Sequence, residues 1–407
     1  MRLTDVVFVA AIAVGAGCRS RPVSVVTPES SRDAIDLTPI SSTGDTSWRS
    51  SAFSDMQTHS HGPQAALILP PKIAPSMLPS RDTTSTPHRA PRVGFNAISP
   101  ASVNEDPEST DFDADEGPAI LRAQVLLDRA HFSTGVLNAN AGQNTAKAVM
   151  FFQEENGLPA SGKLDETTYE KLVNLVGSVD GVVKYALTDD DIRGPYFWIP
   201  ASVYEQADLP CECYASALEM LDERFHTVTD VLIKLNPGVD FAHLAAGNEI
   251  WVPNVEPFNA EHLAKSVATK PIVKIHVAKD GRYVHALAAD GSIVFHFPTT
   301  VGSEYDPSPT GIYHVEGVLW HPVFHYDPAL YSDVPDSRPK ATLKPGPNSP
   351  VGVVWIATSK EHVGIHGTPL PHTIGVASSH GCVRLTNWDA ARLAAAVTPG
   401  VTIEFVK

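Results

Sequence analysis

A long stretch without hydrophobic periodicity limits how much of this chain can fold. Residues 18–117 are rich in Ser, Thr, Pro, Asp and Ala, and no helical or strand period persists through them. Such a segment buries too little apolar surface to offset the entropy lost on folding, so we expect a disordered linker there. Hydrophobic residues make up 43% of the 407 residues, enough for ordinary cores elsewhere. We expect three folded modules, at residues 118–177, 184–253 and 271–407.

The apolar run ahead of this linker predicts a secretory signal peptide at residues 1–17. The run from Val6 to Gly17 follows Arg2 and is shorter than the ~18 residues of a membrane-spanning helix. It ends directly before Cys18, a junction that resembles the lipobox of bacterial lipoproteins. The resemblance implies lipidation of Cys18 and a protein anchored in the cell envelope, secreted across the inner membrane and facing the periplasm or cell wall. The alternative is an ordinary cleaved signal with Cys18 nearby by chance.

The net charge disfavours one class of partner, and the cysteine count excludes a disulfide framework. A formal net charge of −16 repels phosphate backbones, so we expect no nucleic acid partner. The chain has 4 cysteines, far too few for a disulfide framework. Cys211 and Cys213 are expected to form a local disulfide, because a metal site there would need two further ligands that the sequence does not offer.

Residues 118–177 predict a small three-helix domain. Apolar residues recur at helical spacing around Leu127, Phe152 and Leu172, and Asp165 is expected to cap the third helix. The module resembles the three-helix peptidoglycan-binding domain through Gln124, Asn144-Thr145, Ala148, Phe152-Gln153, Gly157-Leu158, Gly162 and Leu164-Asp165. The resemblance implies binding to peptidoglycan, and the alternative is that these residues only build the fold.

Residues 184–253 predict a small α+β module. A helix, a turn at Asn236-Pro237-Gly238 and a short strand at Ile250-Trp251-Val252-Pro253 follow from the pattern. This end resembles LysM, a βααβ module that binds glycan strands, with Tyr185 near its start. An insertion around 195–214, which contains Cys211 and Cys213, interrupts the resemblance.

From residue 271 to residue 407 the pattern changes to strands. Val273, Ile275 and Val277 alternate with polar residues, and further strands are expected at 283–287, 293–297, 311–316, 353–356, 363–365 and 401–406. One helix is expected from Trp388 to Val397, capped by Asn387. The pattern predicts a mostly-β sandwich or barrel with one helix.

One segment of this module carries the residues of a thiol nucleophile. It begins with Ile365-His366-Gly367 and ends with Ser379-His380-Gly381-Cys382-Val383-Arg384. A free thiol is mostly protonated at neutral pH, and a neighbouring His can remove its proton. In an extended segment His380 would share a side with Cys382, and a hairpin-like return would bring His366 beside the thiol.

The residues around the thiol favour acyl transfer through a thioester. Gly381 would let a substrate backbone approach, amides near Gly381 and Cys382 would form an oxyanion hole, and Arg384 would pair with a carboxylate. A zinc site built from His362, His366, His380 and Cys382 is an alternative, disfavoured because no His-Glu-x-x-His helix is present. An inert buried cysteine is disfavoured because a Gly-flanked Cys is a poor core residue.

This segment closely resembles the signature of the L,D-transpeptidase catalytic domain, the YkuD family. Supporting positions are Pro298, Gly302, Pro309-Thr310-Gly311, Pro345-Gly346-Pro347-Asn348, Trp355 and Asn387-Trp388-Asp389. The resemblance implies Cys382 as the nucleophile, His366 as the general acid and base, and His380 as a supporting residue. It further implies substrate contacts at Arg384, Gly381, Ser379 and Gly367, with no metal and no organic cofactor.

The sequence therefore predicts a multidomain protein, with a mostly-β YkuD-type catalytic domain preceded by a three-helix peptidoglycan-binding domain and a LysM-like module. The implied activity is that of a cysteine-dependent acyltransferase, an L,D-transpeptidase that forms 3–3 crosslinks between peptidoglycan stem peptides. Two alternatives stay open. One is an L,D-carboxypeptidase or endopeptidase that uses the same nucleophile, and the other is a non-catalytic wall-binding lipoprotein.

Overall fold

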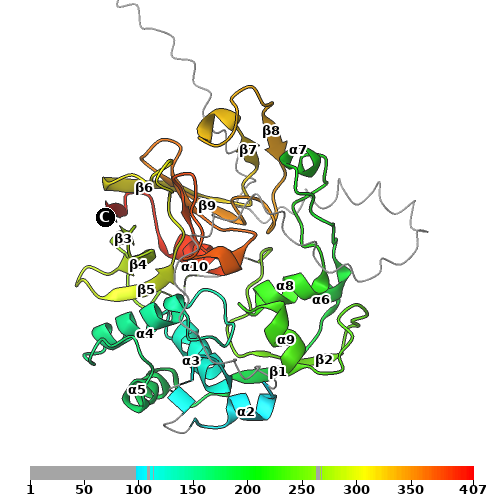
Figure 1. The fold of residues 1–407 in the computed structure, drawn as a ribbon, viewed down its shortest axis with the longest axis vertical. Coiled ribbons are helices and arrows are strands. Elements are labelled where there is room, and N and C mark those ends of the chain that lie inside the picture. Colours follow the sequence, from blue (N-terminus) through cyan, green and yellow to red (C-terminus); the bar gives the residue numbers. More distant parts are fainter. Residues whose placement is uncertain (1–97, 108–110, 113, 263–265, 267) are drawn as a thin grey trace, which may run out of the picture. The chain divides into compact units, whose positions relative to one another are not determined.

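A computed structural model describes residues 98–107, 111–112, 114–262, 266 and 268–407 (Figure 1). The expected signal peptide, Cys18 and residues 18–97 of the expected linker lie outside the described residues. Within the described ranges, no helix is long and apolar enough to cross a membrane.

The end of the expected linker is folded. Helix α2 (Pro100–Asn104) follows the N-cap Ser99, and Val103 is fully buried. The expectation of disorder is therefore wrong for residues 98–107. The physical reason is that Ile98 and Val103 supply apolar surface that packs into a core shared with the two following modules.

The three expected helices of the first module are confirmed as α3 (Pro118–Arg129), α4 (Gln143–Glu155) and α5 (Glu166–Val176). Their common core contains Leu126, Phe152 and Leu172, which are fully buried. The Asp165 carboxylate accepts a hydrogen bond from the Thr168 N–H at 2.8 Å, so it caps α5 as expected.

The middle module is a two-stranded sheet with helices between its strands. Strand β1 (Val182–Ala186) pairs antiparallel with β2 (Glu249–Pro253). Between them in sequence lie α6 (Asp189–Arg193), α7 (Val203–Gln206), α8 (Ala217–Arg224) and α9 (Thr229–Leu235). The expected disulfide between Cys211 and Cys213 is confirmed. It lies in the segment 195–214, which contains α7 and is called the insertion below.

Among the described residues, the third module is built on one mixed eight-stranded sheet with the order β11-β10-β9-β6-β12-β3-β4-β5. Its strands are β3 (Lys274–Ala278), β4 (Tyr283–Leu287), β5 (Ile293–Pro298), β6 (Gly311–Trp320), β9 (Val354–Thr358), β10 (Gly364–His366), β11 (Val383–Arg384) and β12 (Thr402–Val406). Most fall close to their expected positions, although β6 extends to Trp320. A separate hairpin pairs β7 (Phe324–Tyr326) with β8 (Ala341–Leu343).

The two ends of this strand order come together beside the segment that contains Cys382. Thr300, just after β5, exchanges backbone hydrogen bonds with Arg384 of β11 at 2.8 and 3.0 Å. The sheet therefore curls toward itself, in keeping with the expected sandwich or barrel. Its core contains Ile275, Phe295 and Ile403, all fully buried.

Helix α10 (Asn387–Ala396) is present, but its expected cap is wrong. Thr386 takes the N-cap position, and its hydroxyl accepts a hydrogen bond from the Asp389 N–H at 3.2 Å. The Asn387 side chain is buried and donates instead to the Glu223 carboxylate of α8, at 3.0 and 3.1 Å. The Asn387 side chain therefore makes a tertiary contact in place of the expected capping hydrogen bond.

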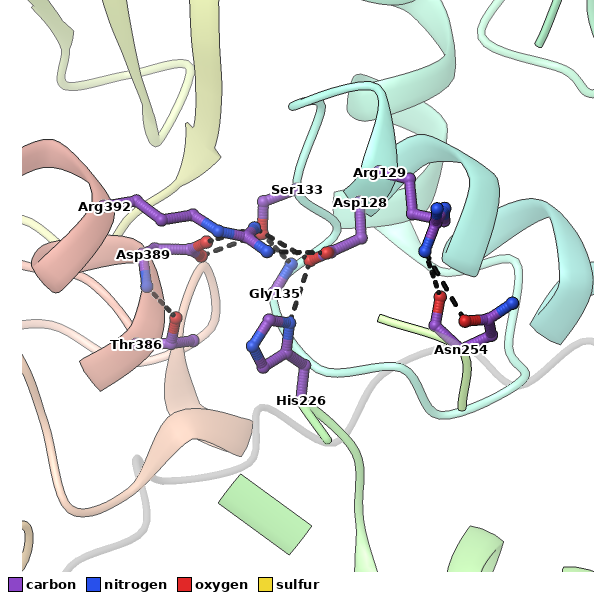
Figure 2. Close-up of polar contacts among 9 residues, drawn as sticks. All are labelled: Asp128, Arg129, Ser133, Gly135, His226, Asn254, Thr386, Asp389 and Arg392. Atoms are coloured by element: carbon purple, nitrogen blue, oxygen red, sulfur yellow. Dashed lines mark hydrogen bonds and ion pairs between the residues drawn. The ribbon is translucent and has the colours of Figure 1, made fainter. Parts of the chain in front are cut away.

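Helix α10 joins all three modules through buried contacts (Figure 2). Arg392 donates two hydrogen bonds to the Asp128 carboxylate of α3, at 2.8 and 3.1 Å. His226 of the middle module lies 3.1 Å from the same carboxylate and stacks on Trp388 with ring centroids 4.9 Å apart. The modules predicted separately from sequence thus share a buried junction.

Candidate active site

The pairing of β10 with β11 brings the side chains of His366, Cys382 and Arg384 to the same face of the sheet. The strands run parallel, with Ile365 opposite Val383 and His366 opposite Arg384. Ile365 and Val383 are fully buried in the core. Because side chains alternate along a strand, His366, Arg384 and the adjacent Cys382 project from the opposite face. His366 and Cys382 therefore share one face of neighbouring strands, through a parallel pair instead of the expected hairpin-like return.

Among the described residues, Cys382 is a free thiol that is half-buried beside β10. Its sulfur lies 3.6 Å from the His362 carbonyl oxygen, to which the thiol donates. Burial raises the pKa of Cys382, and the Gly364 amide and the Arg384 charge offset this only in part. The thiol is consequently protonated at neutral pH and needs a base to become a nucleophile.

His366 supplies a neutral imidazole with a fixed orientation. Its Nδ1 donates to the Gly367 carbonyl oxygen at 2.7 Å, since that oxygen can only accept, and Nε2 is left as the proton acceptor. The ring stacks on Trp355 with centroids 5.3 Å apart. Burial and the Arg384 charge lower the pKa of His366 to about 3, so the ring stays neutral at physiological pH. A Cβ on Gly367 would overlap Asn387, which explains glycine after the histidine.

Arg384 supplies positive charge next to the thiol. Its backbone is fixed by Thr300, and its side chain lies on the Cys382 face of β11. In the part of the chain that the structure describes, its buried Nε–H has no hydrogen-bond partner. The guanidinium therefore retains a donor for an anionic group of a ligand.

The loop before the cysteine is shaped by Gly381. Its φ of +105° breaks the extended run on which the expected alignment of His380 with Cys382 depended, and only glycine adopts this conformation readily. The Ser379 hydroxyl donates to the Cys382 carbonyl oxygen at 2.6 Å, and the Ser308 hydroxyl donates to the Gly381 carbonyl oxygen at 2.8 Å. These bonds hold the turn that presents the thiol.

His380 faces a different set of groups from His366. Its Nε2 lies 3.1 Å from the Asp333 carboxylate, and its ring packs edge-on against Tyr331 with centroids 4.8 Å apart. Burial and the nearby Cys382 raise the pKa of Tyr331. Tyr331, Asp333 and Ser308 belong to loops far from the motif in sequence, and no local pattern identified them. Within the described residues, no three His, Cys, Asp or Glu side chains lie close enough to hold a metal ion.

Comparisons with known proteins match two of the modules. Residues 272–405 match the model of the L,D-transpeptidase catalytic domain, YkuD, and residues 116–172 match "Putative peptidoglycan binding domain". "Putative L,D-transpeptidase YkuD" of Bacillus licheniformis is 28% identical over 186 residues, which are 46% of this chain and 91% of that protein. The protein of the same name from Bacillus subtilis is 27% identical over 44% of this chain and 87% of its own length. L,D-transpeptidase 3 from Mycobacterium tuberculosis is 16% identical, with a TM-score of 0.29 over 40% of this chain and 77% of that chain.

Proposed function

We propose that this chain, which carries an L,D-transpeptidase catalytic domain at 272–405 and a peptidoglycan-binding domain at 116–172, forms 3–3 crosslinks between peptidoglycan stem peptides. The two domains imply peptidoglycan as the partner and the cell envelope as the location of the protein. The observation that carries the proposal is the neutral His366 imidazole on the same face of neighbouring strands as the Cys382 thiol, with Arg384 beside both.

The reaction has two halves. In the first, His366 Nε2 takes the thiol proton while Sγ attacks the carbonyl carbon of the L-centre before a terminal D-Ala. The bond from that carbon to the D-Ala nitrogen breaks, and D-Ala leaves with the proton from His366. In the second half, an amine of another stem attacks the thioester and gives a proton to His366, the carbon–sulfur bond breaks, and His366 returns the proton to sulfur, which restores the Cys382 thiol.

The surrounding residues have supporting parts in this proposal. The Arg384 guanidinium holds a substrate carboxylate, and amides near Gly381 and Cys382 stabilise the oxyanion. Ser379 and Gly367 border the substrate, and His380 supports the site from the Tyr331 side. Incubation of the purified protein with disaccharide-tetrapeptides tests the products. Crosslinked dimers support transpeptidation, tripeptide and D-Ala without dimers indicate an L,D-carboxypeptidase, and unchanged substrate counts against an enzyme.

The change His366→Gln is expected to slow acylation of Cys382 by at least about a hundredfold, because it removes the proton acceptor. Alkylation of the wild-type thiol by iodoacetamide should rise with pH through the raised thiol pKa, with no thiolate plateau near neutral pH. Stopped-flow acylation and a pH series of alkylation rates measure the two effects. Full activity in His366→Gln would transfer the base role to His380.

The amino-terminal features suggest how the enzyme is held near its substrate. We infer that Cys18 carries a lipid anchor after removal of residues 1–17, and that the middle module is a LysM-like glycan-binding module. The paired strands β1 and β2, with α8 and α9 between them once α6 and the insertion are set aside, support the second inference. The change Cys18→Ala is expected to move the protein from the membrane fraction to the soluble fraction of the cell envelope. Unchanged partitioning on immunoblots of the two fractions would refute the anchor.

A further inference from the structure

The insertion of the middle module packs against the catalytic module next to the active site. Helix α7 lies against the β7–β8 hairpin (Figure 1). Val203 and Ala207 join an apolar cluster with Phe324, Leu343 and Trp355. Trp355 is the ring on which His366 stacks, and the Cys382 side chain packs against the same cluster.

The other end of the insertion is bound to the loop at residues 345–348. The Glu212 N–H donates to the Pro345 carbonyl oxygen at 3.1 Å, and the Glu212 carbonyl oxygen accepts from the Asn348 N–H at 2.9 Å. The Asn348 side chain also donates to the Cys213 carbonyl oxygen at 2.9 Å. A Cβ on Gly346 would overlap the Glu212 backbone, so this close approach requires glycine. The Cys211–Cys213 disulfide closes the backbone at the point of contact.

A chain of aromatic contacts links the insertion to the catalytic loop. Tyr204 of α7 meets Tyr326 of β7 edge-on, with centroids 6.2 Å apart. Tyr326 lies 5.3 Å from Tyr331, and Tyr331 lies 4.8 Å from His380. Two three-residue strands are too short to hold a hairpin on their own in water, so the β7–β8 hairpin needs an outside support.

We infer that the insertion supports the β7–β8 hairpin beside the candidate active site, and that Tyr204 is a positioning residue that holds Tyr326 and Tyr331 against His380. This inference rests on the proposed function, because it concerns how the residues beside Cys382 receive a stem peptide. Tyr204 acts through the hairpin and touches no reacting atom. The disulfide fixes the second attachment of the insertion, which gives a use to the two cysteines that the catalytic motif leaves unexplained.

The test compares four variants of the full chain. Tyr204→Ala removes the ring, Tyr204→Phe keeps it, Trp198→Ala removes an exposed ring of the same insertion, and Cys211→Ser with Cys213→Ser opens the disulfide. Tyr204→Ala and the double serine variant are expected to raise KM for tetrapeptide about fivefold, the size of a lost aromatic pair. Alkylation of Cys382 by iodoacetamide should stay unchanged, because the thiol and His366 are untouched. Tyr204→Phe and Trp198→Ala should behave as wild type.

Hydrogen exchange provides a readout that needs no substrate. Amides at 324–331 are expected to exchange faster in Tyr204→Ala than in wild type or Trp198→Ala. Unchanged exchange, or an equal KM increase in Trp198→Ala, would overturn the positioning role. A wild-type protein that forms no adduct with tetrapeptide would refute the proposed function. Faster exchange in Tyr204→Ala would still support the positioning role of Tyr204.

Discussion

The change Cys382→Ser is expected to lower the rate of crosslink formation from tetrapeptides by at least about a thousandfold. A serine hydroxyl is far less acidic than a thiol, so the neutral His366 imidazole removes its proton much less readily. In the proposed mechanism the thiol loses its proton only during attack, because the lowered pKa of His366 and the raised pKa of Cys382 disfavour an ion pair beforehand. The measurement is the initial rate of dimer formation, followed by chromatography and mass spectrometry.

Two controls show whether the loss of activity in Cys382→Ser comes from the missing thiol and not from a change in stability or in peptidoglycan binding. The melting temperature and the binding to isolated peptidoglycan should match wild type, because sulfur is replaced by oxygen at a half-buried position. A Cys382→Ser variant that keeps more than about a tenth of the wild-type rate would place the nucleophile elsewhere.

The change Asp128→Ala is expected to lower the free energy of unfolding by about 3–5 kcal/mol. Burial alone would raise the pKa of Asp128, but Arg392 and His226 outweigh it and hold the pKa well below the usual range. Removing the carboxylate leaves the buried Arg392 guanidinium with only Asp389, at 3.9 Å, as an ion-pair partner in the junction between modules (Figure 2). Urea unfolding followed by tryptophan fluorescence measures the change.

A matched ion pair on the surface provides the comparison for Asp128→Ala. Glu249 pairs with Lys184 at 2.8 Å, with both side chains more than half exposed. Glu249→Ala is expected to cost only about 0–1 kcal/mol, because water screens exposed pairs. Equal stability losses in the two variants would refute the buried junction.

Local patterns predict most of the secondary structure and the three residues proposed for the chemistry. The helices α3 to α5 follow from apolar spacing and the Asp165 cap, and β3 to β5 follow from alternation between turns. Cys382, His366 and Arg384 were identified because their residue types carry chemistry within one short segment. Cys382 and Arg384 share a face because of the two-residue repeat of a strand, whereas His366 joins them only through the parallel pairing of β10 with β11.

Contacts between distant segments could not be derived in this way. From sequence alone Asn387 is expected to cap the helix. Only the fold shows that Glu223 of another module accepts its hydrogen bond. From sequence alone the His380 and Cys382 side chains are expected on the same side. The φ of Gly381 breaks the extended run on which this expectation depends. Residues 98–107 read as linker because two apolar residues form no period, although the fold offers both a buried place. Each case depends on a partner that lies far away in the sequence.

The thioester on Cys382 is tested most directly by mixing wild-type protein with disaccharide-tetrapeptide and quenching within the first turnover. Intact-mass spectrometry should show an adduct equal to the substrate minus D-Ala, and peptide mapping should place it on Cys382. The adduct should disappear as 3–3 dimers accumulate. Dimers formed without any adduct, or an adduct on a residue other than Cys382, would contradict the mechanism.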